Sequence, residues 1–398
     1  MEHLDADVIV AGAGPAGTAA AYDLALQGLR VLILEKATFP RYKVCGAGLT
    51  AKIIPEFPYD ITPVLETTIR SVRLSYRFAE MFTRHTDTPM MFCTMRDKLD
   101  DFMLQKAVSA GAKVLFGEQV KRLKQGDGFV EAETGKQRYR ASLLIGADGV
   151  SGMVARMVGL RENIEPGLAW EAEIAIEPEW LIPLSETVFL DWGTLPGGYG
   201  WMFPKRDHIS VGVGGPAALS GRMMKYYADF LNSLEPGFGN NHQADSLRSW
   251  PIPTRAKKGP LHQGRVLVTG DAAGLTDPMT GEGIWYAVKS GRMAAKTCLE
   301  YLRGRSGSLS GYSEEVNATL MEDILEACRI RNIFNTVPGK IHRLVRDNDR
   351  VWRAFGKILR GERCYADVKR GFGRWSFLWR TTTWLAGFVY RRKGKNYR

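Results

Sequence analysis

A glycine-rich segment close to the N-terminus constrains the fold more than any other feature of the chain. Residues 12–17, Gly-Ala-Gly-Pro-Ala-Gly, have the form G-x-G-x-x-G and follow the apolar run of residues 8–10. The small residues of 16–26 predict a helix, and a second apolar run, 31–34, ends at Glu35. This order of strand, glycine turn, helix, strand and acid is typical of a βαβ unit that binds a dinucleotide.

Each part of this unit has a physical role in such a site. Gly12 permits a tight turn, Gly14 lets the backbone approach a pyrophosphate, and Gly17 lets helix and strand pack closely. The helix N-terminus offers free N–H groups and a positive dipole end to phosphates. Glu35 can accept hydrogen bonds from a ribose diol. The alternative is a βαβ turn that binds nothing.

Composition narrows the class of protein. With 398 residues, 45% of them apolar and 24% charged, the chain has room for two globular domains and a terminal extension. The five cysteines are scattered and form no C-x-x-C, so neither a disulfide framework nor a zinc site is predicted. This use of cysteine predicts a reducing, cytoplasmic location. The N-terminus does not resemble a signal peptide, and no apolar stretch reaches the roughly 20 residues of a membrane span.

The net charge of +11 is concentrated at the C-terminus. Residues 338–398 contain 17 Lys and Arg against 4 Asp and Glu, a net +13, so the rest of the chain is slightly acidic at −2. The tail combines the basic run 391–395 with a dense set of apolar and aromatic residues: Trp375, Phe377, Leu378, Trp379, Trp384, Leu385, Phe388, Val389 and Tyr390. This combination favours peripheral contact with the inner face of a membrane. The alternative is a helical cap packed on the body; no nucleic-acid-binding motif accompanies the charge.

Two segments after the glycine motif are candidates for contact with the same ligand. In the loop of residues 39–49, Arg41 and Lys43 bring positive charge, and the glycines suggest backbone passing close to a flat ligand. Cys45 lies near that ligand in one interpretation and is a small buried hydrophobe in the other. Arg96 stands at the start of a predicted helix, where it reaches a phosphate or a flavin edge or lies on the surface.

Residues 169–215 are predicted to form strands. Tyr199, Trp201 and Phe203 alternate, so on a strand they share one face and make a broad apolar wall, although ordinary sheet core would give the same spacing. The glycines of 211–215 lack the small-residue helix of a second nucleotide site, so a strand and turn are predicted there.

A second strong site follows further along the chain. The apolar strand of residues 265–269 delivers Asp271, whose carboxylate can accept hydrogen bonds from the hydroxyls of a ribityl chain. The segment of residues 277–284 then opens a long helix, predicted over 284–302, through a glycine-rich N-terminus. Such an end can stabilise negative charge, including that of a reduced flavin.

Taken together and in order, these residues resemble the para-hydroxybenzoate hydroxylase-type superfamily of FAD-dependent enzymes over roughly residues 5–305. Within it, residues 40–49, 277–284 and the stretch Pro196-x-x-Tyr199-x-Trp201-x-Phe203-Pro204 are similar to the geranylgeranyl reductase family. The glycine motif and this resemblance together give the predicted FAD contacts: Gly12, Gly14, Ala16, Gly17, Glu35, Cys45, Gly46, Gly48, Arg96, Val120, Asp271, Gly281, Gly283 and Ile284.

The resemblance also implies an activity. Members of that family reduce C=C bonds of geranylgeranyl chains carried by lipids, chlorophyll precursors, diphosphates or quinones, combining a hydride from flavin N5 with a proton. Tyr199, Trp201 and Phe203 would then line the prenyl channel, and their aromatic faces can stabilise developing positive charge. Cys45, Tyr199 and a bound water are the open candidates for the proton donor. The electrons would come from NADPH or a ferredoxin-type partner protein.

The predicted fold class is α/β, α+β overall: a Rossmann-like FAD-binding domain with an interleaved antiparallel-sheet substrate domain and a basic, mainly helical C-terminal region. The predicted boundaries are 1–70, 94–155 and 260–305 for the FAD-binding domain, 71–93 and 156–259 for the substrate domain, and 306–398 for the C-terminal region.

Two other functions compete with the reductase. The first is an FAD-dependent aromatic monooxygenase on the same scaffold. Its halogenase variant would carry W-x-W-x-I-P where this chain has Tyr199 to Pro204, which disfavours halogenation. The second is a flavoprotein that binds a lipid or a partner at the membrane without prenyl chemistry of its own.

Overall fold

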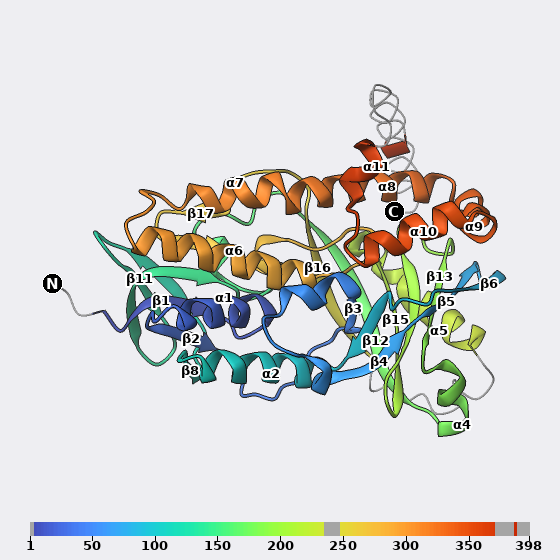
Figure 1. Cartoon of the computed structure of the whole chain (residues 1–398), viewed down its shortest axis with the longest axis horizontal. Coiled ribbons are helices and arrows are strands. Elements are labelled where there is room, and N and C mark those ends of the chain that lie inside the picture. Colours follow the sequence, from blue (N-terminus) through green and yellow to red (C-terminus); the bar gives the residue numbers. More distant parts are fainter. Residues whose placement is uncertain (1–3, 235–246, 371–385, 388–398) are drawn as a thin grey trace.

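The computed structural model describes residues 4–234, 247–370 and 386–387. Two large β-sheets occupy opposite ends of the molecule, and helices pack on both (Figure 1). This combination of sheets and helices confirms the predicted α/β class. The apolar and aromatic residues 375–385 and 388–390 and the basic run 391–395 lie outside the described residues.

The eight-stranded sheet carries the glycine-rich turn. Its main path runs β17-β18-β11-β1-β2-β8, and β1 pairs in parallel with both β2 and β11. A parallel sheet leaves a crevice at the carboxyl ends of its strands where the strand order reverses, and β1 lies at that point. The strands are β1 (Ala6–Ala11), β2 (Val31–Glu35), β8 (Lys113–Phe116), β9 (Arg122–Gln125), β10 (Val130–Glu133), β11 (Arg138–Gly146), β17 (His262–Gln263) and β18 (Val266–Val268).

The seven-stranded sheet lies at the other end of the molecule from the glycine-rich turn (Figure 1). Its strand order is β16-β12-β15-β14-β13-β5-β6, antiparallel except for the parallel pair β13 and β5. Residues 211–215 lie within β15, which confirms the strand predicted there. The strands are β5 (Ser71–Tyr76), β6 (Ala79–His85), β12 (Ile164–Ala175), β13 (Thr187–Trp192), β14 (Tyr199–Pro204), β15 (His208–Pro216) and β16 (Arg248–Arg255).

A small third sheet connects the two halves. It consists of β3 (Gly48–Thr50), β7 (Met91–Thr94) and β4 (Leu65–Ile69), in that order. It therefore joins segments from both sides of the boundary predicted at residue 70. Because β3 directly follows the glycine loop of residues 45–48, this sheet anchors that loop between the two large sheets.

The helices pack closely on the first sheet. The helix predicted over 284–302 is present with those bounds, and α1 begins one residue before its predicted start. A Cβ on Gly291 of α6 would lie 2.2 Å from the carbonyl oxygen of Ala16 in α1, so these two helices touch backbone to backbone. The helices are α1 (Pro15–Leu26), α2 (Arg96–Ser109), α3 (Val154–Met157), α4 (Pro178–Leu181), α5 (Ser220–Ser233) and α6 (Ile284–Leu302).

Within the described part of the chain, five further helices follow α6 along the top of the molecule and over the second sheet (Figure 1). Trp352 and Leu359 of α10 are buried against Val72 of β5 and Val188 of β13. Among the described residues, no helix is long and apolar enough to cross a membrane. These helices are α7 (Ser310–Ala318), α8 (Leu320–Thr336), α9 (Pro338–Asp347), α10 (Asp349–Leu359) and α11 (Tyr365–Arg370).

Candidate active site

The glycine turn has two glycines that the fold needs and one that it does not. Gly12 has φ +103°, and a Cβ there would lie 2.4 Å from the carbonyl oxygen of Ala147. A Cβ on Gly17 would lie 2.0 Å from the carbonyl oxygen of Gly12. A Cβ on Gly14 would meet only Nη2 of Arg41, at 4.0 Å. The open space beside Gly14 fits a ligand that approaches the backbone there, as a pyrophosphate does.

Two backbone hydrogen bonds fix the carboxylate of Glu35 at the end of β2. Its Oε2 accepts a hydrogen bond from the N–H of Ala13 at 2.7 Å, and its Oε1 accepts one from the N–H of Ala37 at 2.9 Å. The side chain is buried and lies on the cavity wall. Each carboxylate oxygen retains a lone pair, so the two backbone contacts fix the direction in which Glu35 can accept bonds from a diol.

A cavity of about 870 Å³ begins at this turn and extends to the second sheet and the C-terminal helices. Of the fourteen predicted FAD contacts, Gly17 is the one that does not line it, since its role is in helix packing. The remaining thirteen lie in the turns that follow β1, β8 and β18, at the end of β2, in the loop that leads into β3, and at or just before the N-termini of α1, α2 and α6, so segments far apart in the sequence meet on one surface. Cavities of this size bind cofactors and small ligands.

Arg96 and Arg41 share one buried carboxylate. Arg96 donates from Nε and Nη2 to the two oxygens of Asp100, at 2.8 and 2.7 Å, and Nη2 of Arg41 lies 3.1 Å from Asp100 Oδ2. Although burial opposes it, Asp100 raises the pKa of Arg96. Nη1 of Arg41 is buried and has no hydrogen-bond partner among the described residues. That free donor lies beside the space at Gly14 and fits a phosphate oxygen. The sequence analysis did not predict this pairing, because only the position of Asp100 one helical turn after Arg96 indicates it.

The loop of residues 45–48 lies against the aromatic strand. Ala47 has φ +49°, an uncommon conformation for a residue with a side chain, and such backbone is concentrated at ligand sites. The buried Nζ of Lys205 donates to the carbonyl oxygens of Gly46 and Thr94, at 2.7 and 2.8 Å. A Cβ on Gly46 would lie 2.7 Å from Nε1 of Trp201. The loop therefore needs glycine to pass this close to the indole ring.

Tyr199, Trp201 and Phe203 share one face of β14, as their spacing predicts. Their ring centroids are 5.7 Å apart for the first pair and 6.3 Å for the second, and all three line the cavity. The hydroxyl of Tyr199 donates to the carbonyl oxygen of Thr280, which ties the ring to the glycine-rich loop before α6. Burial, followed by the charge of Asp277, raises the pKa of Tyr199, so the phenol stays protonated.

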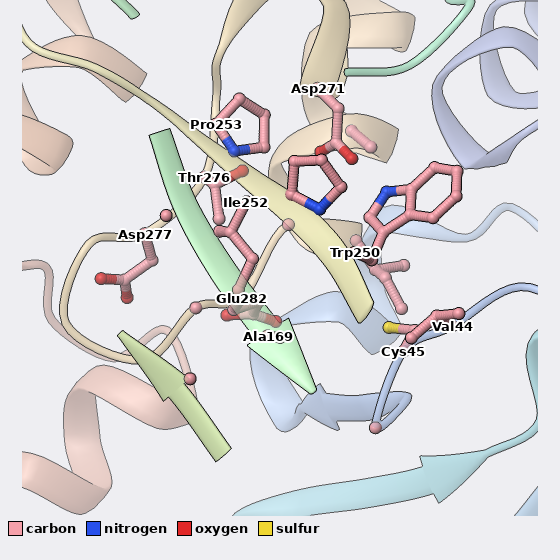
Figure 2. Close-up of a pocket in the computed structure, with 18 of the residues that line it drawn as sticks. Val44, Cys45, Ala169, Trp250, Ile252, Pro253, Asp271, Thr276, Asp277 and Glu282 are labelled. Carbon is pink, nitrogen blue, oxygen red and sulfur yellow. The ribbon is translucent and has the colours of Figure 1, made fainter. Parts of the chain in front are cut away.

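Asp271 and Cys45 face the same part of the cavity from opposite sides. Figure 2 shows Trp250 of β16 between them. Asp271 lies beside the N-terminus of α6, where its Oδ1 is 3.2 Å from the place a Cβ would take on Gly283. Cys45 Sγ accepts a hydrogen bond from the N–H of Ala47 at 3.4 Å. These positions fit a flat ring seated between the loop of residues 45–48 and the start of α6.

Lys43 adds a positive charge near the space between the loop of residues 45–48 and the start of α6. Its ammonium lies 4.0 Å from the centroid of the Trp250 ring and donates to the carbonyl oxygen of Val44 at 3.0 Å. Burial, and then the charge of Arg96, lower the pKa of Lys43 to about 8. An ammonium in this environment is stabilised by an anionic neighbour, which suits a cavity that receives a negatively charged cofactor.

The far end of the cavity combines large apolar side chains with the polar Arg331 and Asn335 of α8, and the sequence did not single out these residues. Phe334 of α8 stacks edge-on against Trp192 of β13, with centroids 5.1 Å apart. Phe355 and Leu359 of α10 also line this end. They are four residues apart, which places them on one helix face, but nothing in the sequence indicates which surface that face covers. The C-terminal helices therefore complete the cavity.

Another helix of this region holds the loop before α6. The hydroxyl of Tyr365 in α11 donates to Oδ2 of Asp277 at 3.0 Å, and both groups are buried. Oδ2 of Asp277 also accepts from the hydroxyl of Thr280 at 2.8 Å. On the other side of the loop, Glu282 accepts from the hydroxyl of Thr50 at 2.6 Å and pairs with Lys52 at 3.2 Å. The loop is thus fixed from both ends of the chain.

Comparison with known proteins agrees with this site. The family described as "FAD binding domain" matches residues 5–186. A menaquinone reductase of Mycolicibacterium smegmatis is 33% identical over 80% of each chain. Digeranylgeranylglycerophospholipid reductase 1 of Methanopyrus kandleri is 30% identical over 77% of this chain and 84% of its own. The chain belongs to the geranylgeranyl reductase family of FAD-dependent oxidoreductases.

Solved structures show the same fold in relatives of lower sequence identity. A geranylgeranyl bacteriochlorophyll reductase-like protein of Thermoplasma acidophilum superposes with a TM-score of 0.73 at 22% identity, covering 83% of this chain and 87% of its own. A flavin-dependent brominase superposes with a TM-score of 0.76 at 21% identity over 98% and 99%. Reductases and halogenating enzymes thus share this fold, and the fold does not choose between their chemistries. The cavity of this family member must therefore carry the functional argument.

Proposed function

We propose that this member of the geranylgeranyl reductase family saturates C=C bonds in a polyprenyl chain of the geranylgeranyl type. One observation carries the proposal: the cavity is continuous from the glycine turn, past Tyr199, Trp201 and Phe203, to an end formed with α8 and α10, where three large apolar side chains lie beside two polar ones: Phe334, Phe355, Leu359, Arg331 and Asn335. A prenyl chain is long, flexible and apolar, so it requires such an extension beyond the cofactor. The names of the relatives, which include a geranylgeranyl diphosphate reductase of Arabidopsis thaliana at 28% identity, support the same substrate class.

The described residues have distinct parts in this reaction. When bound and reduced, FAD supplies a hydride. Arg41 and the free N–H groups of α1 bind phosphate, and Glu35 orients a ribose. Trp201 presents its indole face to the carbon that becomes electron-deficient, and Phe334, Phe355 and Leu359 offer apolar contact to the rest of the chain. Cys45 and Tyr199 remain candidates for moving the proton, from positions on the cavity wall.

An anaerobic reduction assay tests the substrate class. The purified protein, carrying FAD reduced with dithionite, is incubated with geranylgeranyl lipids that differ in headgroup, and the products are weighed by mass spectrometry. We expect stepwise gains of two hydrogens for each reduced bond. If no headgroup yields such gains while FAD is present and reducible, the proposal is wrong. NADPH consumption in air that an aromatic compound stimulates would then favour the monooxygenase. Replacing dithionite with NADPH or with a reduced ferredoxin identifies the donor, which we propose is one of these two.

We also propose peripheral membrane contact through the C-terminal region. In α9 and α10, Arg343, Arg350 and Arg353 are exposed, and Leu344 is 44% exposed. Exposed cations beside an apolar side chain suit an anionic membrane surface. We expect the protein to sediment with vesicles containing anionic lipid, and less of it to sediment as the salt concentration rises. Replacing these three arginines with glutamate should release the protein from the vesicles. Equal binding to vesicles of neutral lipid alone, or no loss in the triple variant, would contradict the proposal.

A further inference from the structure

Two glutamates lie on the cavity side of β12. Along this strand, Trp170, Ala172 and Ile174 pack into the core beneath α5, so the alternate residues Glu171 and Glu173 face the other way. Glu171 lines the cavity although only 1% of its surface is exposed to solvent. A carboxyl group in this position is expensive to bury in its charged form.

The strand register places Glu171 in the same row as Trp201. Glu171 of β12 pairs with Gly212 of β15, and Gly212 pairs in turn with Trp201 of β14. Since Gly212 has no side chain, nothing on β15 separates the two. A Cβ on Gly212 would lie 2.2 Å from the indole ring, so Trp201 leans across the glycine toward β12. Glu171 therefore reaches the cavity wall beside the aromatic stripe.

Hydrogen-bonding groups connect Glu171 to the protein surface. Glu171 and Glu173 are neighbours on one face of β12 and shift each other's pKa, and the Oε2 atom of each is buried without a hydrogen-bond partner among the described residues. Nε2 of His208 lies 3.0 Å from Oε2 of Glu173, and Nδ1 of His208 lies 2.6 Å from Oδ1 of Asp207. The side chain of Asp207 is 84% exposed. One end of the series is in solvent and the other is on the cavity wall.

We propose that Asp207, His208, Glu173 and Glu171 form a proton relay from solvent to the cavity, with Glu171 as the proton donor to the substrate. The proposal rests on the function proposed above. For each C=C bond, the reduced flavin supplies one hydride and Glu171 one proton, so the π bond breaks and two C–H bonds form. Glu171 becomes a carboxylate. His208 gives its Nε2 proton to the carboxylate of Glu173, which passes a proton on to Glu171, and the neutral imidazole of His208 is then reprotonated from solvent beside Asp207.

The electrostatics of the series place its resting protons on Glu171 and His208: although burial opposes it, the hydrogen bond of His208 lowers the pKa of Glu173, which therefore rests as a carboxylate. Burial, and then the hydrogen bond and charge of Glu173, raise the pKa of Glu171, so it keeps its proton at a pH where a free glutamate is ionised. Although burial alone would lower it, Glu173 and Asp207 raise the pKa of His208. Several other groups face the pair: Ser210, which donates to Glu171 at 3.0 Å, Lys205, Tyr42 and Arg248, while the charge of Glu171 also acts on Tyr227 of α5. Lys205 opposes the shift and favours the carboxylate.

The first test needs no cofactor. In the protein freed of FAD, infrared spectroscopy is used to find the C=O stretch of a protonated carboxyl group, and its loss is followed as pH rises. We expect this band to disappear in Glu171→Gln and to persist in the control Glu179→Gln, an exposed residue of α4. NMR titration of His208 should show a lower pKa in Glu173→Gln and in Asp207→Asn. A band unchanged in Glu171→Gln, or a His208 pKa unmoved in both other variants, overturns the relay.

The second test measures electron transfer to the flavin and proton transfer to the substrate separately. In Glu171→Gln, dithionite should reduce the bound FAD at the rate of the unaltered protein, while reoxidation by a geranylgeranyl lipid should slow by about 10²-fold, as for loss of a general acid. The unaltered protein should lose activity as pH rises through the raised pKa of Glu171, and this alkaline limb should be absent from the variant. Reoxidation at the unaltered rate with an unchanged pH profile overturns the proposal.

Two further arms keep the outcome interpretable. If Glu171→Gln does not fold, Asp207→Asn replaces it, because Asp207 is exposed and its loss leaves the core intact; its reoxidation should slow and recover with added small buffer acids. If the unaltered protein reduces no prenyl lipid, the proposed function fails, yet the infrared and NMR titrations still decide whether the four groups are connected. The two failures are therefore distinguishable.

Discussion

Replacing Gly17 with alanine is expected to abolish FAD binding. A Cβ at this position would lie 2.0 Å from the carbonyl oxygen of Gly12 and 3.1 Å from a methyl group of Val10. The obstructing oxygen belongs to the backbone of the turn, which cannot rotate away as a side chain can. Helix α1 must therefore move off β1, and its N-terminus no longer points into the cavity. Overpacking of this kind costs about 1–3 kcal/mol or more in the free energy of unfolding.

Gly14→Ala is the matched control in the same turn. Gly14 has φ −74°, which alanine adopts without strain, and its nearest neighbour is 4.0 Å away. As the N-cap of α1 it should lose about 1 kcal/mol or less in the FAD-free protein. FAD affinity should nevertheless fall at least tenfold, because the added methyl group fills the space for the pyrophosphate. Thermal unfolding of the FAD-free proteins and titration with FAD measure the two effects separately.

The pair has outcomes that would contradict the argument. If Gly17→Ala retains FAD and its thermal stability, the helix does not depend on this close approach. If Gly14→Ala binds FAD as tightly as the unaltered protein, the pyrophosphate does not lie against Gly14. Loss of stability in both variants would mean that the open space at Gly14 is needed for folding and not for the ligand.

The domain that carries the glycine turn was predictable because short-range sequence patterns specify its strands, turns and helices. The apolar runs around residues 8 and 31 mark strands buried on both faces, and glycines mark the turn between strand and helix. For α6, a glycine-rich start and a long apolar helix pattern gave the observed bounds, residues 284–302. Likewise, the alternation of Tyr199, Trp201 and Phe203 gave their shared face, because residues two apart on a strand always share one.

Contacts between distant segments were not predictable in this way. Tyr365 reaches Asp277 across 88 residues of chain, and Phe334 reaches Trp192 from a helix in another part of the fold. No local pattern specifies such a partner, since hydrophobic spacing says that a face is buried but not against what. Glu171 is a similar case: alternation places it opposite Trp170, but only the register with Gly212 shows that it lies beside Trp201.

Trp201→Ala is expected to lower kcat/KM for the prenyl substrate by about 30- to 150-fold. Loss of apolar contact with the chain and of the indole face costs together about 2–3 kcal/mol, which corresponds to that factor. Trp201 is 6% exposed, and its indole packs over Gly212 and against Gly46. Truncation therefore also leaves a void beneath the loop of residues 45–48, so FAD affinity and thermal stability must be measured with the rates.

Trp201→Phe is the control that separates the aromatic face from the space it fills. Phenylalanine keeps an aromatic face beside the substrate, and we expect it to recover most of the rate in single-turnover reduction of a geranylgeranyl lipid. Trp201→Leu keeps apolar bulk without the face, and we expect it to recover binding, seen as KM, but not kcat. If leucine restores kcat as fully as phenylalanine does, the indole acts as packing alone. If alanine changes neither the rate nor the choice among prenyl substrates, Trp201 does not contact the reacting chain. The three side chains thus distinguish charge stabilisation, which acts on kcat, from hydrophobic contact, which acts on ground state and transition state alike.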